Sequence, residues 1–358
     1  MLIQKFTTLF KDVTRQGTKI PKEEYLTHGK NIIIDQGQDI IAGYTNCEDG
    51  IFKKIPAIVF GDHTRIIKYV DTPFFLGADG VKVLKCTDKN ANYRYLYYAL
   101  KNAHIPNTGY NRHFKWLKEI TINYPDKNRQ NDIVNILDKL EYIIKMKSQE
   151  LDKFDELIKA RFVEMFGDPQ DSKSKWKKST IEKCCTLKSG KTLPRNIENE
   201  GGNIPYVKVK DMNSLENTTY ITTSTRFVSD KTANKSIFPV GTVIFPKRGG
   251  AIGTNKKRLT KVPICADLNI MGVIPDNTRI SSYYLFEYFN MVDLNTLNNG
   301  SSVPQINNKD INPLNINIPP LSLQNEFANF VHQVDKSKFE NIVYLNKTLS
   351  SKILSQLG

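Results

Sequence analysis

The chain has 358 residues, 39% hydrophobic and 25% charged, which suits a globular protein of two domains with connectors. It contains no run that approaches the roughly 18 apolar residues of a membrane span, and its N-terminus lacks the basic start and apolar core of an export signal. Its formal net charge of +14 favours a nucleic-acid partner, because cations near phosphates release counterions, although charge alone does not prove one.

The first part of the chain is a mixture of short strands and a short helix. Apolar runs between Gly, Asp and Asn turns predict strands at Asn31–Ile34 and Ala57–Phe60. The aromatic segment Tyr93–Ala103 predicts a short helix. This mixture indicates an α/β domain ahead of the long helix that follows.

A long amphipathic helix is predicted from Asn128, a favourable N-cap residue, to a stop at Gly167-Asp168-Pro169. At 1.5 Å per residue it would be roughly 55 to 60 Å long, more than a compact domain needs internally. Its apolar residues are spaced four and three apart, as in a coiled-coil seam, with Lys147 in one vacant place. These residues are Ile133, Leu137, Leu140, Ile144, Leu151, Phe154 and Ile158.

The second part of the chain has the same composition of elements. The hydrophilic stretch 171–179 predicts a linker, Pro205–Val207 and Thr242–Phe245 predict strands, and Ser282–Val292 predicts a helix. A second long helix is expected from about Ser322. Its apolar stripe, which residues 335–338 interrupt, consists of Phe327, Val331, Val334, Phe339, Ile342, Leu345, Leu349 and Ile353. The two stripes could bury each other; the alternative is that each helix packs on its own domain.

The two parts repeat one phrase. "ITINYPDKNRQNDIV" begins at Ile120, and "LNINIPPLSLQNEFA" begins at Leu314, 194 positions later and without a gap. Asn123, Pro125 and Gln130 thereby align with Asn317, Pro319 and Gln324. After a shift of five, Tyr95-Leu96-Tyr97 aligns with Tyr284-Leu285-Phe286. One unit is therefore used twice, with a period too long for a solenoid.

No catalytic motif is present in the sequence. Ser189 to Thr192 resembles the end of a phosphate loop, but Cys185 stands where that loop requires glycine. A cofactor loop after a strand, a serine-hydrolase elbow and a spaced zinc set are all missing. The carboxylate pairs Glu23-Glu24 and Glu198/Glu200 are typical of a solvated surface. The sequence thus predicts no catalytic residue, no metal ligand set and no bound cofactor.

The cysteines favour a reducing compartment. There are five, with no C-x-x-C pair, and an odd count does not indicate a disulfide framework: Cys47, Cys86, Cys184, Cys185 and Cys265. We expect reduced thiols and a cytoplasmic protein.

Three polar loops are candidates for contacts with a partner. "FGDHTR", residues 60–65, ends a predicted strand, and we expect it to present hydrogen-bonding side chains rather than a metal or proton site. Residues 108–116 and 299–307 occupy corresponding places just before the repeated phrase. Their amide and guanidinium groups are of the kinds that address base edges, Asn and Gln pairing with adenine and Arg with guanine.

The basic residues are concentrated between Asp230 and Asp267, a window with no other acidic residue. Residues 246–261 hold several cations around the glycines of a Gly-Gly-Ala-Ile-Gly segment, which allows a close backbone approach. We expect Lys256, Lys257 and Arg258 to contact phosphates at a glycine-rich tip; the alternative is a flexible, solvated hairpin tip without a partner.

Several of these phrases together resemble one family. "IDQGQDIIAGYT" from Ile34, "FGDHTR", "GADGVKVLK" from Gly77, "KARFVEMFGDP" from Lys159 and "NIPPLSLQN" from Asn317 are similar to phrases of the specificity (S) subunit of type I restriction-modification systems. They cover both halves of the chain. The Asp126-Lys127-Asn128 segment departs from the family pattern, which the second copy, Pro320-Leu321-Ser322, follows more closely.

The resemblance implies an α+β fold, in which two α/β target-recognition domains are joined by two long antiparallel α-helices that form a coiled-coil spacer with a pseudo-twofold internal repeat. The implied boundaries are 1–126 and 169–320 for the recognition domains and 127–168 and 321–358 for the helical regions. Together with the loop chemistry it implies DNA contacts by Asp35, Gln36, Gln38, His63, Thr64, Arg65, Tyr110, Asn111, Arg112, His113, Lys247, Arg248, Lys256, Lys257, Arg258, Ser302 and Gln305.

The implied function is sequence-specific binding of double-stranded DNA at a bipartite site, one domain per half-site, by a non-catalytic subunit. The implied partners are two modification (methyltransferase) subunits and restriction/translocase subunits, with no membrane. S-adenosylmethionine, ATP and Mg are then expected on those partners and none in this chain. Three alternatives remain open: the specificity subunit of a related type II-like restriction/methylation enzyme, a self-sufficient nuclease or methyltransferase, and a protein-interaction adaptor whose charge is incidental.

Overall fold

The computed structural model describes residues 2–77, 80–109, 111–169, 174–234, 236–297 and 303–357, with side chains as far as Tyr344. The chain divides into two compact units, which are described separately. Unit 1 comprises residues 1–146 and 348–358, and unit 2 comprises residues 147–347. In the described part of the chain, no helix combines the length and the apolar character that crossing a membrane requires.

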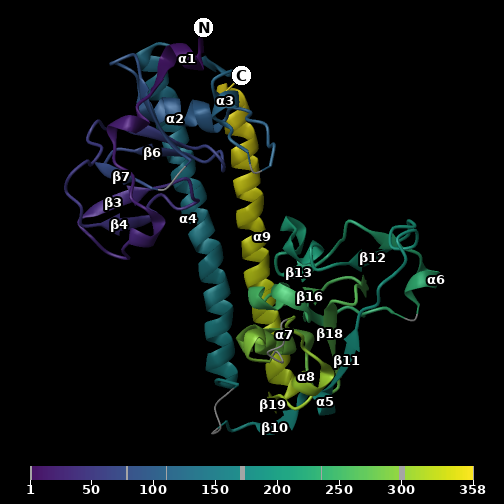
Figure 1. Cartoon of the computed structure of the whole chain (residues 1–358). Coiled ribbons are helices and arrows are strands. Elements are labelled where there is room, and N and C mark those ends of the chain that lie inside the picture. Colours follow the sequence, from purple (N-terminus) through teal and green to yellow (C-terminus); the bar gives the residue numbers. More distant parts are fainter. Residues whose placement is uncertain are drawn as a thin grey trace. The chain divides into compact units, whose positions relative to one another are not determined.

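The body of unit 1 consists of two small sheets with short helices packed beside them, and a third sheet has only two described strands (Figure 1). Its elements in chain order are β1 Ile3–Lys5, α1 Phe6–Leu9, β2 Phe10–Asp12, β3 Asn31–Ile34, β4 Gly43–Thr45, β5 Ala57–Gly61, β6 Ile67–Val70, β7 Phe74–Leu76, β8 Val81–Cys86, α2 Tyr93–Lys101, α3 Phe114–Leu117 and β9 Thr121–Asn123, followed by the start of α4, Lys127–Phe166. The four-stranded sheet has the order β2-β8-β5-β6, antiparallel throughout. The three-stranded sheet has the order β4-β3-β7, with β3 antiparallel to β4 and parallel to β7.

Unit 2 repeats this plan. Its elements after the end of α4 are β10 Lys177–Thr180, α5 Ile181–Cys184, β11 Cys185–Ser189, β12 Ile204–Val207, β13 Tyr220–Ile221, β14 Phe227–Val228, α6 Asp230–Ala233, β15 Val243–Pro246, β16 Arg258–Thr260, β17 Cys265–Ala266, β18 Ile270–Pro275, α7 Ser282–Met291, α8 Asn308–Ile311, β19 Asn315–Ile318 and α9 Leu321–Leu357. Its sheets have the orders β11-β18-β15-β16-β13 and β14-β12-β17, with β12 antiparallel to β14 and parallel to β17. Only β13, parallel to β16, has no counterpart among the described strands of unit 1.

The phrase that occurs twice in the sequence forms the same local structure in both units. Ile120 accepts the N–H of Phe6 at 3.0 Å, and Leu314 accepts that of Ile181 at 3.0 Å. The strands that follow, β9 and β19, pair antiparallel with β1 and β10, the first strands of their units. The predicted strands and the two predicted aromatic helices are confirmed at β3, β5, β12, β15, α2 and α7. The predicted linker 171–179 is wrong at its end, because Lys177–Thr180 forms β10.

A buried glutamine explains why the phrase contains Gln130 and Gln324. Both side chains are buried, and each amide N–H donates to a proline carbonyl five residues earlier, at 2.8 Å in both copies. Each amide oxygen accepts the N–H of the residue that caps the aromatic helix, Asn92 at 3.0 Å or Ser281 at 2.7 Å. The glutamine therefore ties the start of a long helix to the start of the aromatic helix.

The aromatic helix is fixed from its other face as well. The side chain of its cap, Asn92 or Ser281, accepts N–H groups of the first turn. The Tyr95 hydroxyl then donates to the carbonyl of Asn123 at 2.5 Å, and the Tyr284 hydroxyl donates to that of Asn317 at 2.9 Å. These are the residues that the sequence alignment paired, so the pattern records one packing arrangement used twice.

The ends of the long helices partly match the prediction. Helix α4 ends at Phe166, and Gly167 adopts a φ of +80°, which confirms the predicted stop. Its N-cap was predicted two residues too late, at Asn128. The cap is Asp126, whose carboxylate accepts the N–H of Arg129 at 3.0 Å, and Asn128 lies inside the first turn. Ser322 likewise lies inside α9.

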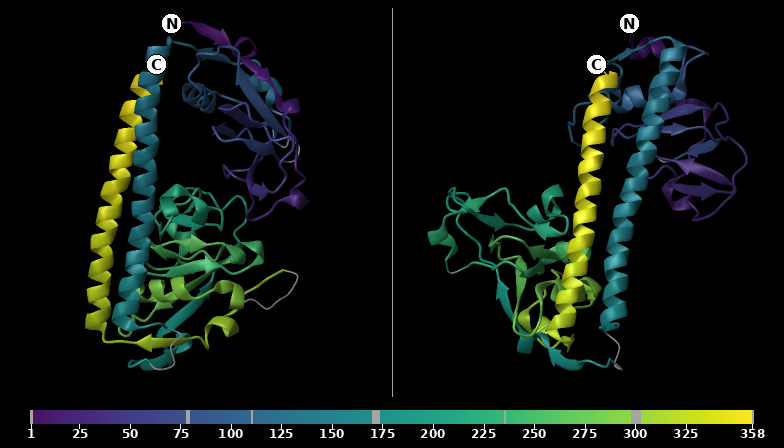
Figure 2. Two further views of the ribbon diagram at one scale, coloured as in Figure 1. Left: turned by 90° about the vertical axis from the view of Figure 1, so that its left-hand side faces the viewer. Right: turned by 180° about the vertical axis from the view of Figure 1, so that it is seen from behind.

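Within unit 2, the end of α4 and the start of α9 lie side by side (Figure 2). Lys147 donates to Asn341 at 2.9 Å, Asp155 pairs with Lys338, and Arg161 pairs with Glu326 at 3.2 Å. Because the partners follow in opposite order along the two helices, these segments are antiparallel. The rings of Phe162, Phe166 and Phe327 pack together with Tyr284 of α7.

Some residues of the predicted apolar stripes pack on their own domain, others pack between the two long helices, and others are exposed. Ile133 and Leu137 belong to the core of unit 1 together with residues of α2 and β5. This agrees with the alternative in which each long helix packs on its own domain. Ile158 joins the core that α9 shares in unit 2. The burial predicted for Phe339 and Ile342 is wrong, because these side chains are 66% and 44% exposed. Leu345, Leu349 and Ile353 lie outside the described side chains.

We predict that Gln324→Ala lowers the free energy of unfolding by about 2–4 kcal/mol, because it leaves the Ser281 N–H and the Pro319 carbonyl buried without their partner. Asn325→Ala is the matched control, since Asn325 is the exposed neighbour and should change stability by less than about 0.5 kcal/mol. Denaturant unfolding followed by circular dichroism measures both. Equal effects of the two substitutions would contradict a structural role for the glutamine.

Candidate nucleic-acid interface

In unit 1, the polar residues that follow β3 and β5 lie together with the chain that precedes α3. The side-chain oxygen of Gln36 accepts the N–H of His63 at 3.2 Å. The Gln36 carbonyl accepts the Thr64 hydroxyl at 2.7 Å. Arg65, whose φ of 63° is left-handed, donates to the carbonyl of Ile105 at 3.1 Å. Loops from three places in the sequence thus form one surface.

A buried lysine fixes the first of these loops. The Lys68 side chain is 4% exposed, and its Nζ lies 3.5 Å from the Asp35 carboxylate and donates to the Asp39 carbonyl at 2.5 Å. Burial lowers the pKa of Lys68, and the Asp35 charge opposes that shift. Sequence analysis missed Lys68. The available signal was its place in β6, where it shares a face with buried Val70.

His113 is a structural residue rather than a surface residue. Its side chain is fully buried, and its Nδ1 lies 3.0 Å from the Asp62 carbonyl oxygen. The Asp62 carboxylate accepts the N–H of Phe114 at 2.7 Å. In this conformation the buried ring holds the chain before α3 to the β5 loop, and we assign it no DNA contact. Asp62, not chosen from sequence, joins the β5 loop to α3.

The remaining predicted residues of unit 1 differ in exposure. Gln38, Thr64, Asn111 and Arg112 are exposed, whereas Asp35, Gln36, His63 and Arg65 are half-buried. Tyr110 lies outside the described residues. The exposed group supplies amide, hydroxyl and guanidinium groups, and the half-buried group fixes the loops that carry them.

In unit 2, two predicted stretches that lie far apart in sequence are joined. Arg248 and Gln305 form an antiparallel bridge, and the Arg248 guanidinium donates to the Gln305 side-chain oxygen at 3.3 Å. The N–H of Gly249 donates to the carbonyl of Pro304 at 2.8 Å. Lys247 donates to the hydroxyl of Ser189 at 2.8 Å. Ser302 lies outside the described residues.

The loop after β5 in unit 1 and the loop after β15 in unit 2 are held by equivalent backbone hydrogen bonds. The N–H of Asp62 donates to Gly80, and its carbonyl accepts from His113, at 2.6 and 2.8 Å. The N–H of Lys247 donates to Asn269, and its carbonyl accepts from Ile306, at 2.8 and 2.9 Å. His63 and Arg248, which come next, therefore occupy equivalent positions with different side chains.

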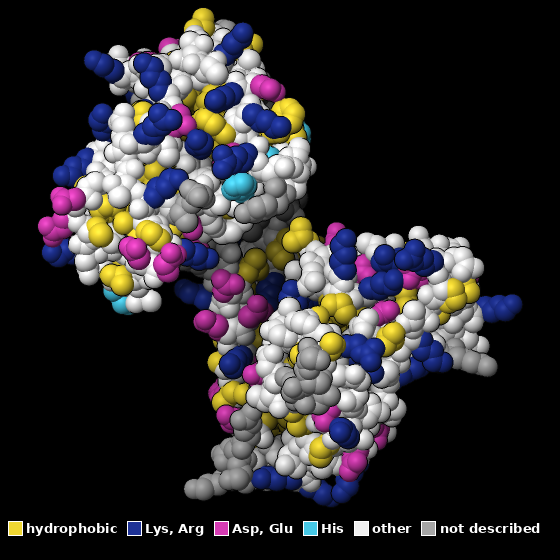
Figure 3. Space-filling model, in the orientation of Figure 1, with side chains coloured by type: hydrophobic (Ala, Val, Ile, Leu, Met, Phe, Trp, Pro, Cys, Tyr) yellow, Lys and Arg dark blue, Asp and Glu magenta, His cyan; other side chains and the backbone are white. Residues whose placement is uncertain are grey.

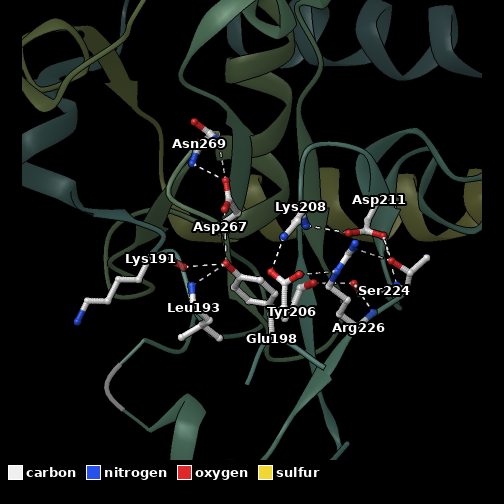
Figure 4. A network of polar contacts seen from close by, with 11 residues as sticks. Lys191, Leu193, Glu198, Tyr206, Lys208, Asp211, Ser224, Arg226, Asp267 and Asn269 are labelled. Carbon is white, nitrogen blue, oxygen red and sulfur yellow. Dashed lines mark hydrogen bonds and ion pairs between the residues drawn. The ribbon is translucent and has the colours of Figure 1, made fainter. Parts of the chain in front are cut away.

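A polar network supports the neighbouring loops of unit 2 (Figure 4). Glu198 lies between Lys208 and Arg226, 2.5 Å and 3.4 Å from their nitrogens, and the hydrogen bond from Lys208 lowers the pKa of Glu198. Buried Asp211 accepts the N–H of Lys208 at 2.8 Å. Sequence analysis had treated Glu198 as solvated surface. The available signal was the polar run that follows the predicted strand 205–207, as Asp35 follows the strand of unit 1.

A glycine in this region permits close packing. Gly190 belongs to the phrase that resembles a phosphate loop, and a Cβ there would approach the Asp267 carbonyl to 2.1 Å. The phrase thus serves the contact between β11 and the end of β17.

Residues 246–261 form regular structure rather than an open glycine-rich tip. Residues 249–254 form a 3₁₀ helix and β16 begins at Arg258. Lys257 is 4% exposed and donates to the carbonyl of Val292 and the side chain of Asn255, both at 2.7 Å. Arg258 donates to the carbonyls of Asn217 and Met212. These two cations support the domain, so they are not free to contact phosphates; the half-buried Lys256 contacts Asn213.

Charge is distributed over both units. In the orientation of Figure 3, Lys and Arg side chains are scattered over the visible face of each unit with acidic side chains among them. Among the described residues, no group of three or more His, Cys, Asp or Glu side chains is placed to hold a metal ion.

Comparison with known proteins gives consistent matches. The family model of the type I restriction modification DNA specificity domain matches residues 8–153 and 173–350. A curated relative, the type I restriction enzyme EcoR124I/EcoR124II specificity subunit of Escherichia coli, is 24% identical over 330 residues, 85% of this chain and 79% of the relative.

Two solved structures are similar along nearly the whole chain. The S subunit of the type-I restriction-modification system from M. genitalium has a TM-score of 0.57 at 18% identity, covering 99% of this chain and 95% of that one. A chain from a structure of complex assembly and conformational transition of the type I R-M system has a TM-score of 0.53 at 13% identity, with coverages of 99% and 93%. At these identities the likeness establishes the fold alone.

We predict that Lys257 makes unfolding pH-dependent. Burial lowers its pKa from 10.5 to about 8, so between these values the unfolded state binds more protons and stability rises with pH. Lys257→Met should flatten this rise, while Lys256→Met keeps the wild-type slope. Free energies of unfolding measured from pH 7.5 to 10.5 test this. Parallel curves for wild type and Lys257→Met would contradict a depressed pKa.

Proposed function

The chain belongs to the family of type I restriction-modification DNA specificity domains, and we propose that it is a specificity subunit that binds a bipartite DNA site, one unit per half-site. The observation that carries this proposal is the duplication: two units of the same strand order place polar loops at the same edge of their sheets. Two similar readers in one chain fit two half-sites.

The proposed contacts follow the exposure of the side chains. In unit 1 we assign DNA contacts to Gln38, Thr64, Asn111 and Arg112, together with half-buried His63. In unit 2 we assign them to exposed Arg248 and half-buried Lys247, while Gln305 acts through Arg248. Amide and guanidinium groups can address base edges, and the cations can contact phosphates. Asp35, Gln36 and Arg65 then act by positioning their loops.

We further propose the domain boundaries 1–126, 127–168, 169–320 and 321–358, in which the helical regions are both a spacer and the docking surface for two modification subunits. Those subunits would bring S-adenosylmethionine, and restriction/translocase subunits would bring ATP and Mg, in the cytoplasm. This chain then contributes binding and orientation but no reacting group.

The direct test is the methylated motif of cells that produce this chain with its modification subunit. We expect long-read methylome sequencing to show one bipartite motif with an unread gap, which disappears when this chain is omitted. Stoichiometric binding of S-adenosylmethionine to the chain alone, or DNA cleavage by it, would instead favour a self-sufficient enzyme.

We predict that the helices set the gap between half-sites. Inserting four residues after Lys147 adds one turn and roughly 6 Å of rise, which corresponds to about one or two base pairs. Because Lys147 contacts Asn341 and the two helices are antiparallel, the matching insertion in α9 belongs immediately before Asn341, after Glu340. Methylome sequencing of the double insertion should show a longer gap and unchanged half-sites. Altered half-sites with the original gap would show that the helices do not measure distance.

A further inference from the structure

The segment that carries Arg248 is fixed by backbone bonds on both sides. Lys247 accepts the N–H of Ile306 at 2.9 Å, and Gly249 donates to Pro304 at 2.8 Å. Ile306 is fully buried, so the strand opposite Arg248 is anchored in the core of unit 2. The Cα of Arg248 is therefore held on a rigid element, although its side chain is exposed.

The guanidinium is oriented by a relay of two amides. The Gln305 oxygen accepts from Arg248 Nη2 at 3.3 Å, and the Gln305 nitrogen donates to Asn307 at 2.8 Å. Asn307 is itself fixed, because it caps α8 in a reciprocal hydrogen-bond box with Asp310. The bond to Asn307 orients the Gln305 amide, so that its oxygen faces Arg248. The bond from Arg248 to this oxygen then orients one edge of the guanidinium group.

The rest of the guanidinium remains available. An arginine has five N–H donors, and among the described residues Gln305 alone accepts one from Arg248. A planar pair of donors in a fixed position matches the two acceptors, O6 and N7, on the major-groove edge of guanine. A phosphate contact needs no such support, since a mobile lysine suffices for it.

We propose that Arg248 reads a guanine in the half-site of unit 2 and that Gln305 is its positioning residue; this inference rests on the proposed function. The equivalent position in unit 1 is His63, which has no guanidinium fork. The same backbone position therefore distinguishes the two half-sites by its side chain.

The experiment uses the chain assembled with its modification subunits. Arg248→Ala should make one G·C position of one half-site degenerate in the methylome. Binding to the cognate duplex should fall roughly 10- to 100-fold, whereas nonspecific binding falls about twofold or less. Arg248→Lys keeps the charge but loses the fork, so it should relax the same position with nonspecific binding unchanged.

Gln305 is tested through its dependence on Arg248. Gln305→Ala should partly relax the same base pair, and the double variant should be no worse than Arg248→Ala, because the amide acts through the guanidinium. Gln305→Glu keeps an acceptor for the guanidinium but cannot donate to Asn307, so its discrimination should lie between those of the wild type and Gln305→Ala. Lys183→Ala is the matched control. Lys183 is an exposed cation just before β11, at the opposite end of that strand from Ser189, which contacts Lys247 beside Arg248. Its loss should leave the methylated motif unchanged.

The outcomes separate the two levels of inference. A wild-type motif without G·C in the affected half-site, an Arg248→Ala variant that weakens all DNA alike with an intact motif, or additive effects of Arg248 and Gln305 would each overturn this proposal and leave the proposed function standing. Absence of any bipartite motif in wild-type cells would overturn the proposed function itself.

Discussion

One buried amide in each unit determines how a long helix joins its domain. Gln130 and Gln324 are buried, so an unpaired amide would be costly there, and their nitrogens and oxygens are both bonded. The partners are a proline carbonyl just before the long helix and the cap of the aromatic helix. A change in the direction of the long helix would break at least one of these bonds. The helix therefore leaves the domain in one direction, and the loops at the sheet edges keep a defined relation to it within each unit.

The same separation of roles recurs at the loops. Buried polar groups, Asp62 and Lys68 in unit 1 and Asp211 in unit 2, bond to backbone groups of the loops and fix their course. The side chains that project from those loops, such as Arg112 and Arg248, are free to differ because they do not support the frame. A fold with this division can keep one scaffold and change its ligand preference by replacing exposed residues alone.

Most of the architecture could be predicted from the sequence, because it depends on local and periodic patterns of residues. The repeated phrase, the strands between turns and the Gly167 stop depend on neighbouring residues, and all are found in the structure. The errors concern residues whose surroundings come from elsewhere in the chain. Lys257 is buried because Val292, 35 positions away, supplies a carbonyl, and His113 is buried because Asp62, 51 positions away, does so. Arg248 and Gln305 were both chosen from sequence, but their pairing needed the fold, since no local pattern joins positions 57 apart.

Lys68 has a second consequence, for association between chains. In the described sheet order, β6 is the last strand of its sheet, so one row of its backbone groups faces outward and could accept a strand from another molecule. A lysine that points inward from such a strand opposes this, because adding a strand would bury its ammonium group further. Unit 2 solves the same problem by covering β16 with β13 in parallel register. Two copies of one fold thus protect the same exposed edge from aggregation, one with a buried charge and the other with an added strand.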